Sequence, residues 1–152
     1  MTSVTVRTAT LDDLLAVAGL FDRYRQFYEQ KPDLELATRF ISDRMSKHES
    51  AILIAEDSEQ SMVGFCQLYP TFCSVSAAPI YVLYDLFVCS EARRIGAGRA
   101  LLFAARQAAI EAGKSRLDLS TAKTNTAAQT LYESSGWQRD ELFYTYSLSL
   151  DE

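Results

Sequence analysis

The sequence predicts a single mixed α/β domain that spans residues 1–152. The chain has 152 residues, of which 48% are hydrophobic, and this is enough apolar material for one sizeable core. Segments that alternate apolar and polar residues, as strands do, are interspersed with segments of helical periodicity, and no repeat or linker separates them. Few prolines and glycines accompany many tyrosines and phenylalanines, which excludes a disordered or low-complexity chain.

The first elements are a strand followed by two helices. "VTVRTA", residues 4–9, alternates in the manner of a half-buried strand. Thr10 and Asp13 have the spacing of a capping box, and apolar residues then recur at helical spacing as far as Tyr28. The stretch "KPD" ends this helix, and a second helix is expected over residues 34–45.

Strands dominate the middle of the chain. The apolar runs at 51–56 and 62–72 flank a polar turn and predict a hairpin. "IYVLYDLFV", residues 80–88, carries apolar residues at successive positions, which is typical of a central strand covered on both faces. A helix is expected over residues 98–112, with Gly113 as its left-handed cap, and "RLDLS" predicts another short strand.

The C-terminal part predicts a short helix and a final hairpin. The helix is expected over residues 126–134, and the alternation in "WQRDELFYTYSLSL", residues 137–150, favours two paired strands. Counted from the first strand to this hairpin, the sequence predicts about seven strands and about four helices.

Charge and composition exclude several classes of function. The net charge of −5 and the pI near 4.9 disfavour nucleic acid as a partner and suit a cationic or amine partner better. The N-terminus lacks the pattern of a signal peptide, and no apolar run is long enough to cross a membrane. We therefore expect a cytoplasmic protein with no membrane partner.

The cysteines and the histidine do not predict a metal site. Cys66, Cys73 and Cys89 are odd in number, widely spaced and contain no CxxC pair. His48 lies in the polar stretch "SKHES" and is most simply a solvated loop residue. We expect reduced thiols, buried or half-buried, and no bound metal.

A glycine-containing turn, "RRIGAG" at residues 93–98, joins the strand at 80–88 to the following helix. It is either an ordinary helix start or a phosphate site, in which free backbone N–H groups and the helix dipole bind the anion. The Walker pattern is absent, and the dinucleotide pattern requires a small residue where Leu101 stands.

A second segment, "NTAAQTLYESSGW" at residues 125–137, has the features of a capped helix. Asn125 is a natural N-cap, Ala128 and Tyr132 share one helical face, and Gly136 follows the last turn. Taken alone, the segment is a short amphipathic helix with a tyrosine that packs in a core.

Together the two segments resemble the GNAT family of acyl-CoA N-acyltransferases. Arg93, Gly96 and Gly98 match the family's pyrophosphate-loop pattern Q/R-x-x-G-x-G/A. Residues 125–137 match N-x-x-A-x-x-L-Y-x-x-x-G-F/W at every specified position. The resemblance covers essentially the whole chain and implies the GNAT fold, a mixed, mostly antiparallel twisted sheet flanked by helices, with acetyl-CoA as co-substrate.

The resemblance also implies which residues bind coenzyme A. The family's cofactor contacts come from the strand end, the pyrophosphate loop and the later helix. These positions correspond here to Leu86, Phe87, Val88, Arg93, Arg94, Ile95, Gly96, Ala97, Gly98, Arg99, Asn125, Ala128 and Tyr132.

The implied chemistry is attack of an amine on a thioester, which requires a base, an oxyanion donor and an acid. The family's pattern makes Tyr132 the acid that protonates the sulfur and the backbone N–H of Val88 the oxyanion donor. Asp85 is the candidate base, directly or through water, although a structural carboxylate is equally consistent with the sequence. Tyr84 is a candidate to line the acceptor site.

The acceptor site in this family is built by the first two helices, and here Tyr24, Tyr28 and Glu29 are the candidates. Aromatic rings with carboxylates suit a small cation, but the same tyrosines also fit the core stripe of a helix. The segment with Asp85 is most similar to the polyamine and Hpa-type small-amine acetyltransferases. It departs from the spermidine/spermine enzymes, because Tyr84 stands where they have glutamate.

The function implied is an N-acetyltransferase that acts on a primary amine of a small molecule such as a polyamine or an amino acid. Two alternatives stay open: an acetyltransferase of protein N-termini or lysines, and a non-catalytic acyl-CoA-binding module. The resemblance to the family also implies a homodimer, with "LFYTYSLSL" as a candidate edge strand.

Overall fold

The computed structural model describes residues 3–151, which divide into two compact units, the first ending at Ser120 and the second beginning at Thr121. The first unit contains the sheet and three of the α-helices found in the described residues. The second contains one short helix and an extended C-terminal segment. With this division, the expectation of a single domain over residues 1–152 stays a prediction.

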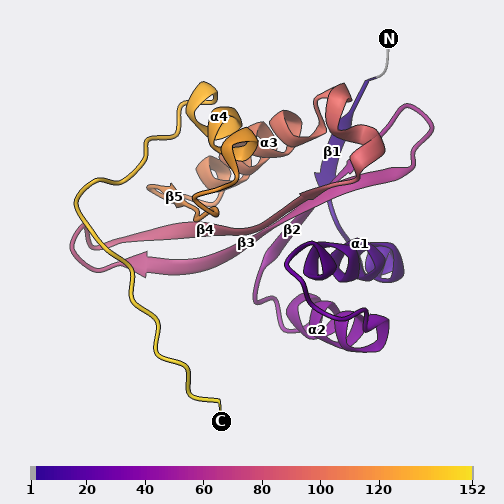
Figure 1. The fold of residues 1–152 in the computed structure, drawn as a ribbon, viewed down its shortest axis with the longest axis horizontal. Helices are drawn as coiled ribbons and strands as arrows, with labels where there is room; N and C mark the ends of the chain where they lie inside the picture. Colours follow the sequence, from indigo (N-terminus) through magenta and orange to yellow (C-terminus); the bar gives the residue numbers. More distant parts are fainter. Residues whose placement is uncertain (1–2, 152) are drawn as a thin grey trace. The chain divides into compact units, whose positions relative to one another are not determined.

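The sheet has five strands in the order β1-β2-β3-β4-β5 (Figure 1). The first three pairings are antiparallel and the last is parallel, so the predicted mixed, mostly antiparallel sheet is confirmed. The strands are β1 (Thr5–Thr8), β2 (Ala51–Glu56), β3 (Met62–Cys73), β4 (Ala78–Val88) and β5 (Leu117–Asp118).

The predicted final hairpin is wrong for the described residues, and the strand count is five where about seven were expected. From Gln138 to Asp151 the chain has no strand, and its large apolar side chains are 80–89% exposed. Alternation of apolar and polar residues describes a strand only when a neighbouring strand supplies hydrogen bonds and a face to bury. This segment has the alternation without such a partner.

Helices cover both faces of the sheet in the first unit (Figure 1). On one face, α1 (Leu14–Phe27) packs against α2 (Leu34–Ser46) and against strands β3 and β4. On the opposite face, α3 (Ala97–Glu111) packs over β1 to β4. A hydrophobic cluster under α1 and α2 comprises Val17, Leu20, Phe21, Ala37, Ile41, Ile52, Ile54, Phe65, Phe87 and Cys89. This burial, rather than local propensity, stabilises the helices.

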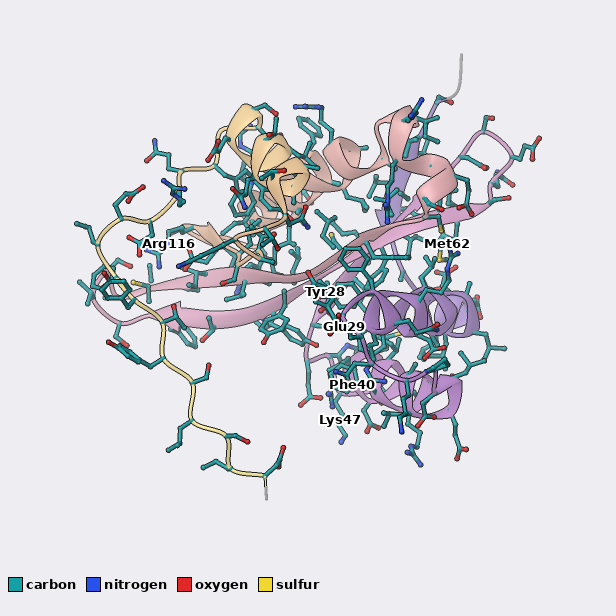
Figure 2. The ribbon with its side chains drawn as sticks, viewed as in Figure 1. Tyr28, Glu29, Phe40, Lys47, Met62 and Arg116 are labelled. Atoms are coloured by element: carbon teal, nitrogen blue, oxygen red, sulfur yellow. The ribbon has the colours of Figure 1, made fainter. Side chains whose placement is uncertain are left out.

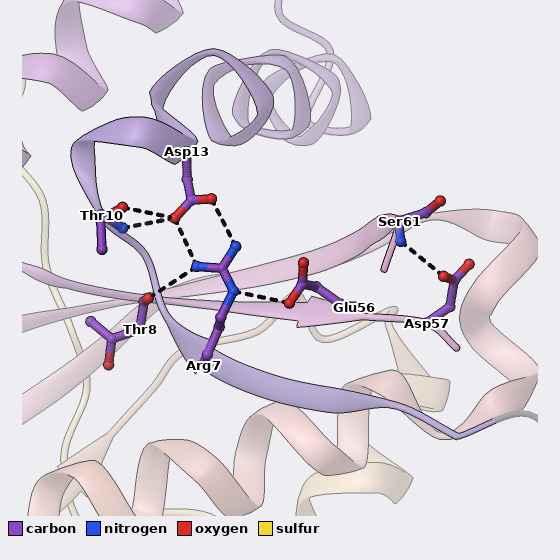
Figure 3. A network of polar contacts seen from close by, with 7 residues as sticks. All are labelled: Arg7, Thr8, Thr10, Asp13, Glu56, Asp57 and Ser61. Atoms are coloured by element: carbon purple, nitrogen blue, oxygen red, sulfur yellow. Dashed lines mark hydrogen bonds and ion pairs between the residues drawn. The ribbon is translucent and has the colours of Figure 1, made fainter. Parts of the chain in front are cut away.

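A polar network fixes the start of α1 to the sheet (Figure 3). The Asp13 carboxylate accepts the backbone N–H of Thr10 at 2.8 Å, which confirms the predicted capping interaction. Arg7 donates to both Asp13 oxygens and to Glu56 on β2. Hydrogen bonding to the Arg7 guanidinium lowers the pKa of Asp13 to about 2. One arginine therefore joins β1, β2 and the one-turn 3-10 helix η1 (Leu11–Asp13).

Short turns connect β2, β3 and β4. The Asp57 carboxylate accepts the N–H of Ser61 at 2.9 Å and closes the β2–β3 turn (Figure 3), so the predicted hairpin is confirmed. Strands β3 and β4 are joined by four residues, with Ala77 in the left-handed region at φ 52°. β2, β3 and β4 thus form a meander of consecutive antiparallel strands.

The caps of α2 and α3 follow the sequence patterns. The Asp33 carboxylate accepts the N–H of Leu36 and begins α2. At the end of α3, Gly113 has φ 74° and donates to the Ile110 carbonyl, while Lys114 donates to the Ala109 carbonyl. These two bonds form a Schellman motif, as the position of Gly113 predicts.

The second unit is organised around α4 (Thr126–Ser134), whose bounds match the predicted helix. The Asn125 side chain accepts the N–H of Ala128 at 3.1 Å and caps the helix. Gln129 donates to the carbonyls of Ala122 and Lys123, which holds the preceding turn against the helix.

Candidate active site

The loop predicted to bind phosphate folds as a 3-10 segment, η2 (Ser90–Ile95), followed directly by α3. Gly96 stands between them in the left-handed conformation, φ 84°, which L-residues other than Asn and Asp rarely adopt. The first helical bond runs from the Ala100 N–H to the Gly96 carbonyl at 3.0 Å. The helix therefore begins at Ala97, one residue before the predicted start.

This loop has the features of an anion site. The N–H groups of Ala97 and Gly98 belong to the first turn of a 15-residue helix, where no intrahelical acceptor exists and the dipole is positive. A Cβ built on Gly96 meets no heavy atom within 4 Å, so the backbone is open to a close-lying ligand. Arg93 and Arg94 are exposed in the last turn of η2 and add positive charge. The residues present fit a pyrophosphate.

The remaining loop residues have mixed environments. Ile95 is half-buried and Ala97 is fully buried, so these two contribute backbone groups rather than side chains to a ligand. The Arg93 Nε donates to the Val88 carbonyl at 3.3 Å and ties the loop to the end of β4. The Arg99 side chain is exposed at the first turn of α3.

The end of β4 presents backbone groups at its outer edge. Cys89 donates its N–H to Val63 on β3, and because N–H groups alternate sides along a strand, that of Val88 points the other way. On that side β5 pairs with Tyr81 and Val82 and ends at Asp118. The edge from Leu86 to Val88 thus extends past β5, at the strand end that the resemblance assigns to coenzyme A.

A β-bulge in β4 determines where Asp85 and Tyr84 lie. Asp85 is paired with Gln67, whereas the next residue of β3, Leu68, is paired with Leu83, so Tyr84 is the extra residue. Phe87, two residues beyond Asp85, belongs to the cluster under α1, which places Asp85 on the α1 face of the sheet.

Asp85 is a buried carboxylate held by a polar chain. It is 4% exposed, and its Oδ2 accepts the Gln67 Nε2–H at 2.6 Å. The Gln67 side chain is fully buried, and its Oε1 accepts the Ser50 hydroxyl at 2.7 Å. Burial raises the pKa of Asp85 above its usual value, and the hydrogen bond from Gln67 opposes this change.

Tyrosines surround this carboxylate. The Tyr24 hydroxyl donates to the Tyr84 carbonyl at 3.2 Å, and its pKa is raised by burial and by the nearby Asp85 charge. Tyr69 on β3 contacts Tyr84 edge to face at 5.8 Å between ring centroids. Burial, with Asp85 nearby, raises the pKa of Tyr69 to about 12. Tyr28 contacts Tyr24 edge to face at 5.2 Å.

The predicted acceptor residues are therefore mostly brought together. Tyr24, Tyr28, Tyr84 and Asp85 form one cluster, and Tyr24 also packs against Phe65 in the core, while its role toward an acceptor stays a prediction. Tyr84 is 69% exposed, so β4 is not fully covered at its bulge, contrary to the expectation for the whole strand. Glu29 is exposed next to Tyr28 at the end of α1 (Figure 2).

Three members of the cluster were missed in the sequence. Gln67 is the polar residue in the otherwise apolar "VGFCQLY", and a buried polar side chain in a strand requires a partner, which is the signal that was available. Tyr69 follows two positions later on the same strand face. Ser50 lies in a polar loop and has no distinguishing pattern.

In the second unit, Tyr132 lies in the last turns of α4. Its ring is 6.1 Å from that of Trp137, and its carbonyl accepts the Trp137 N–H at 3.0 Å. Asn125 and Ala128 form the N-terminal cap of the same helix. The motif that carries the resemblance is thus one capped helix closed by Gly136 at φ 94°.

Other features of the described residues do not add to the site. Cys66 and Cys89 are buried and Cys73 is half-buried, all as free thiols, and His48 is exposed, as predicted. Residues 3–151 contain no group of three or more potential metal ligands, and none of their helices is both long and apolar enough to cross a membrane. An open hollow lies apart from the site residues and is lined by Leu14, Leu34, Glu35, Thr38, Arg39, Ser42 and Asp43.

The chain is similar in sequence and fold to known N-acetyltransferases. The chain is 46% identical over 145 residues, 95% of its length and 97% of the relative, to the uncharacterized N-acetyltransferase YhfO of Bacillus subtilis. A crystal structure of a probable acetyltransferase superposes with a TM-score of 0.91 at 38% identity, covering 97% of this chain and 99% of that one.

A more distant structure shares the fold. It is the aminoglycoside N-acetyltransferase AAC(6')-Iy in complex with CoA, with a TM-score of 0.81 at 16% identity over 97% of this chain and 96% of the other. Residues 16–137 match the Acetyltransferase (GNAT) family. The chain therefore belongs to the GNAT family of acetyltransferases.

Proposed function

We propose that this N-acetyltransferase transfers the acetyl group of acetyl-CoA to a primary amine of a small molecule. The observation that carries the proposal is the buried Asp85 carboxylate among Tyr24, Tyr28, Tyr69 and Tyr84. A carboxylate among aromatic rings attracts a compact cation and then accepts its proton. Acetyl-CoA is the co-substrate used by the family, and the open N-terminus of α3 fits its pyrophosphate.

The proposed reaction proceeds by direct attack within a ternary complex. The ammonium proton passes to Asp85, directly or through water, and the amine nitrogen bonds to the thioester carbonyl carbon. The Val88 N–H stabilises the oxyanion that develops. The C–S bond then breaks, and the sulfur takes the proton of the Tyr132 hydroxyl, the role that the family's motif implies for this residue. The nitrogen loses its second proton to solvent as the amide forms, and the Tyr132 oxygen regains a proton from solvent.

The closer similarity to the polyamine and Hpa-type enzymes is part of this proposal. It is supported by Asp85, three residues before Val88, and by the tyrosines that surround it. An acceptor on a protein N-terminus or lysine is the alternative. Homodimerisation through residues 142–150 stays a prediction, and their exposed apolar side chains are consistent with it.

A panel of acceptors tests the function. Purified protein is incubated with acetyl-CoA and with polyamines, amino acids, aminoglycosides or lysine-containing peptides, and release of free thiol is measured. Turnover on a small amine supports the proposal, and turnover confined to peptides overturns the substrate class. Thermal stabilisation by CoA with no turnover on any acceptor shows an acyl-CoA-binding module instead.

Tyr132→Phe is expected to lower kcat at least tenfold while the KM for acetyl-CoA stays within about twofold. Phenylalanine keeps the ring next to Trp137 and removes only the hydroxyl proton offered to the sulfur. Steady-state kinetics on the best amine measure both constants. Tyr146→Phe, which removes a hydroxyl from an exposed tyrosine, is the control. An unchanged kcat removes Tyr132 from the chemistry.

Gly96→Ala is expected to lower the free energy of unfolding by about 1 kcal/mol, because φ 84° is strained for alanine. It is also expected to weaken CoA binding, since relief of that strain turns the first N–H groups of α3 away from the phosphates. Gly113→Ala is the matched control, because it has the same strain at the other end of α3. Calorimetric titration with CoA distinguishes them: equal affinity in both variants contradicts the role of Gly96.

A further inference from the structure

Asp85 has no charged partner among residues 3–151. None of the ion pairs found among residues 3–151 involves it. The groups near it are tyrosines from α1, β3 and β4, with the buried thiol of Cys66 on β3 and with Arg44 of α2 beyond Tyr69. A buried carboxylate without a cation must be stabilised by hydrogen bonds if it is to act as a base.

The Gln67 amide donates to Asp85 at 2.6 Å, and an interaction with the Tyr24 hydroxyl also favours the charged carboxylate. An amide offers a donor on one side and an acceptor on the other, so its orientation decides whether it stabilises or repels a carboxylate. Ser50 is matched to this orientation, because its hydroxyl donates to Oε1 at 2.7 Å while Nε2 faces Asp85. The arrangement is the one that matches the ionised form of Asp85.

We propose that Gln67 and Ser50 are positioning residues for the base: Ser50 orients the Gln67 amide, and Gln67 holds Asp85 ionised and fixes its Oδ2. The ionised carboxylate then accepts the proton of the amine or of a bridging water. This inference rests on the proposed function, in which Asp85 accepts that proton.

Gln67→Met and Ser50→Ala test the hydrogen-bonded series Ser50–Gln67–Asp85. Methionine fills the volume of glutamine without the donor, and alanine removes the hydroxyl that orients it. Loss of a hydrogen bond to a charged carboxylate disfavours the ionised form, so the acidic limb of the kcat/KM profile moves to higher pH in both variants. On that limb we expect kcat/KM to fall about tenfold in Gln67→Met and less in Ser50→Ala. Ser50→Thr, which keeps the hydroxyl, restores the wild-type limb.

Ser115→Ala is the matched control. It also removes one serine hydroxyl with one hydrogen bond, but that bond goes to the Pro79 carbonyl and does not involve Ser50, Gln67 or Asp85. A purely structural role lowers the melting temperature without moving the limb, and that result overturns the inference. Where Gln67→Met fails to fold, Ser50→Ala and its threonine rescue decide the question.

A second readout does not require turnover. The carboxyl carbon of Asp85, assigned by comparison with Asp85→Asn, is titrated by carbon-13 NMR in the wild type and in the variants. A higher midpoint in Gln67→Met and Ser50→Ala supports the inference, and coincident midpoints overturn it. Absence of turnover on every amine in the wild type defeats the proposed function alone, because the titration still reports on Gln67 and Ser50.

Discussion

Asp85→Asn is expected to lower kcat/KM for the amine acceptor by about 100-fold or more, because asparagine accepts no proton from the amine. Its side chain has the shape of aspartate, and its Oδ1 still accepts the Gln67 Nε2–H, so the fold and acetyl-CoA binding are retained. Steady-state kinetics across pH measure the effect, and the acidic limb assigned to Asp85 disappears. Asp12→Asn, at an exposed aspartate in η1, is the control and keeps wild-type rates.

The same variant has a stability signature with a defined sign. Burial raises the pKa of Asp85, so the folded protein favours the protonated carboxyl more than the unfolded chain does. Stability is therefore lost as the pH rises from the pKa of the unfolded chain, near 3.8, through the pKa of the folded protein. Asp85→Asn is therefore expected to melt above the wild type at pH 8, with the difference closing toward pH 4. Wild-type kcat/KM in Asp85→Asn, or a lower melting temperature at pH 8, contradicts this account of the carboxylate.

Gly64→Ala is expected to lower the free energy of unfolding by about 1–3 kcal/mol, the usual cost of overpacking a core. A Cβ at this position lies 2.8 Å from the Phe87 carbonyl oxygen, 3.2 Å from Val88 Cγ2 and 3.3 Å from Leu101 Cδ1. The nearest atom belongs to the backbone, so β3 and the end of β4 must separate. Because Val88 is the proposed oxyanion donor, kcat also falls.

Gly19→Ala provides the matched control in the same chain. Gly19 lies within α1, and a Cβ there meets no heavy atom within 4 Å, so alanine is expected to raise stability by about 0.5–1 kcal/mol. Denaturant unfolding of both variants gives the two free energies, and kinetics give kcat. Gly64→Ala with the stability and kcat of the wild type contradicts the tight contact at the strand end.

The helices and the three turns with glycine in the left-handed region were predictable because local chemistry decides them. Caps such as Asn125 and Asp33, and C-terminal glycines such as Gly113, act through hydrogen bonds within a few residues, so their patterns are visible in the sequence. The phosphate loop around Gly96 belongs to the same class of signal.

The acceptor cluster was only partly predictable because a change of register creates it. Strict alternation places Tyr84 and Asp85 on opposite faces, and the bulge opposite Gln67 alters this by making Tyr84 an extra residue. The position of a bulge depends on pairing with a strand some 20 residues away. The alternation of apolar and polar residues within β4 does not reveal that pairing. The C-terminal hairpin failed for a related reason, since propensity without a pairing partner does not make a strand.

The meander of β2, β3 and β4 has a consequence for how chain entropy is lost on folding. Its two ladders are the largest in the sheet, and each closes through a turn of four or five residues. Strand β1 reaches β2 only across both α1 and α2, and β5 reaches β4 only across α3. The entropy of loop closure grows with loop length. The conformational freedom given up to assemble the sheet is therefore concentrated at its two margins, while the strands that carry Asp85 and Gln67 assemble from contacts that are close in sequence.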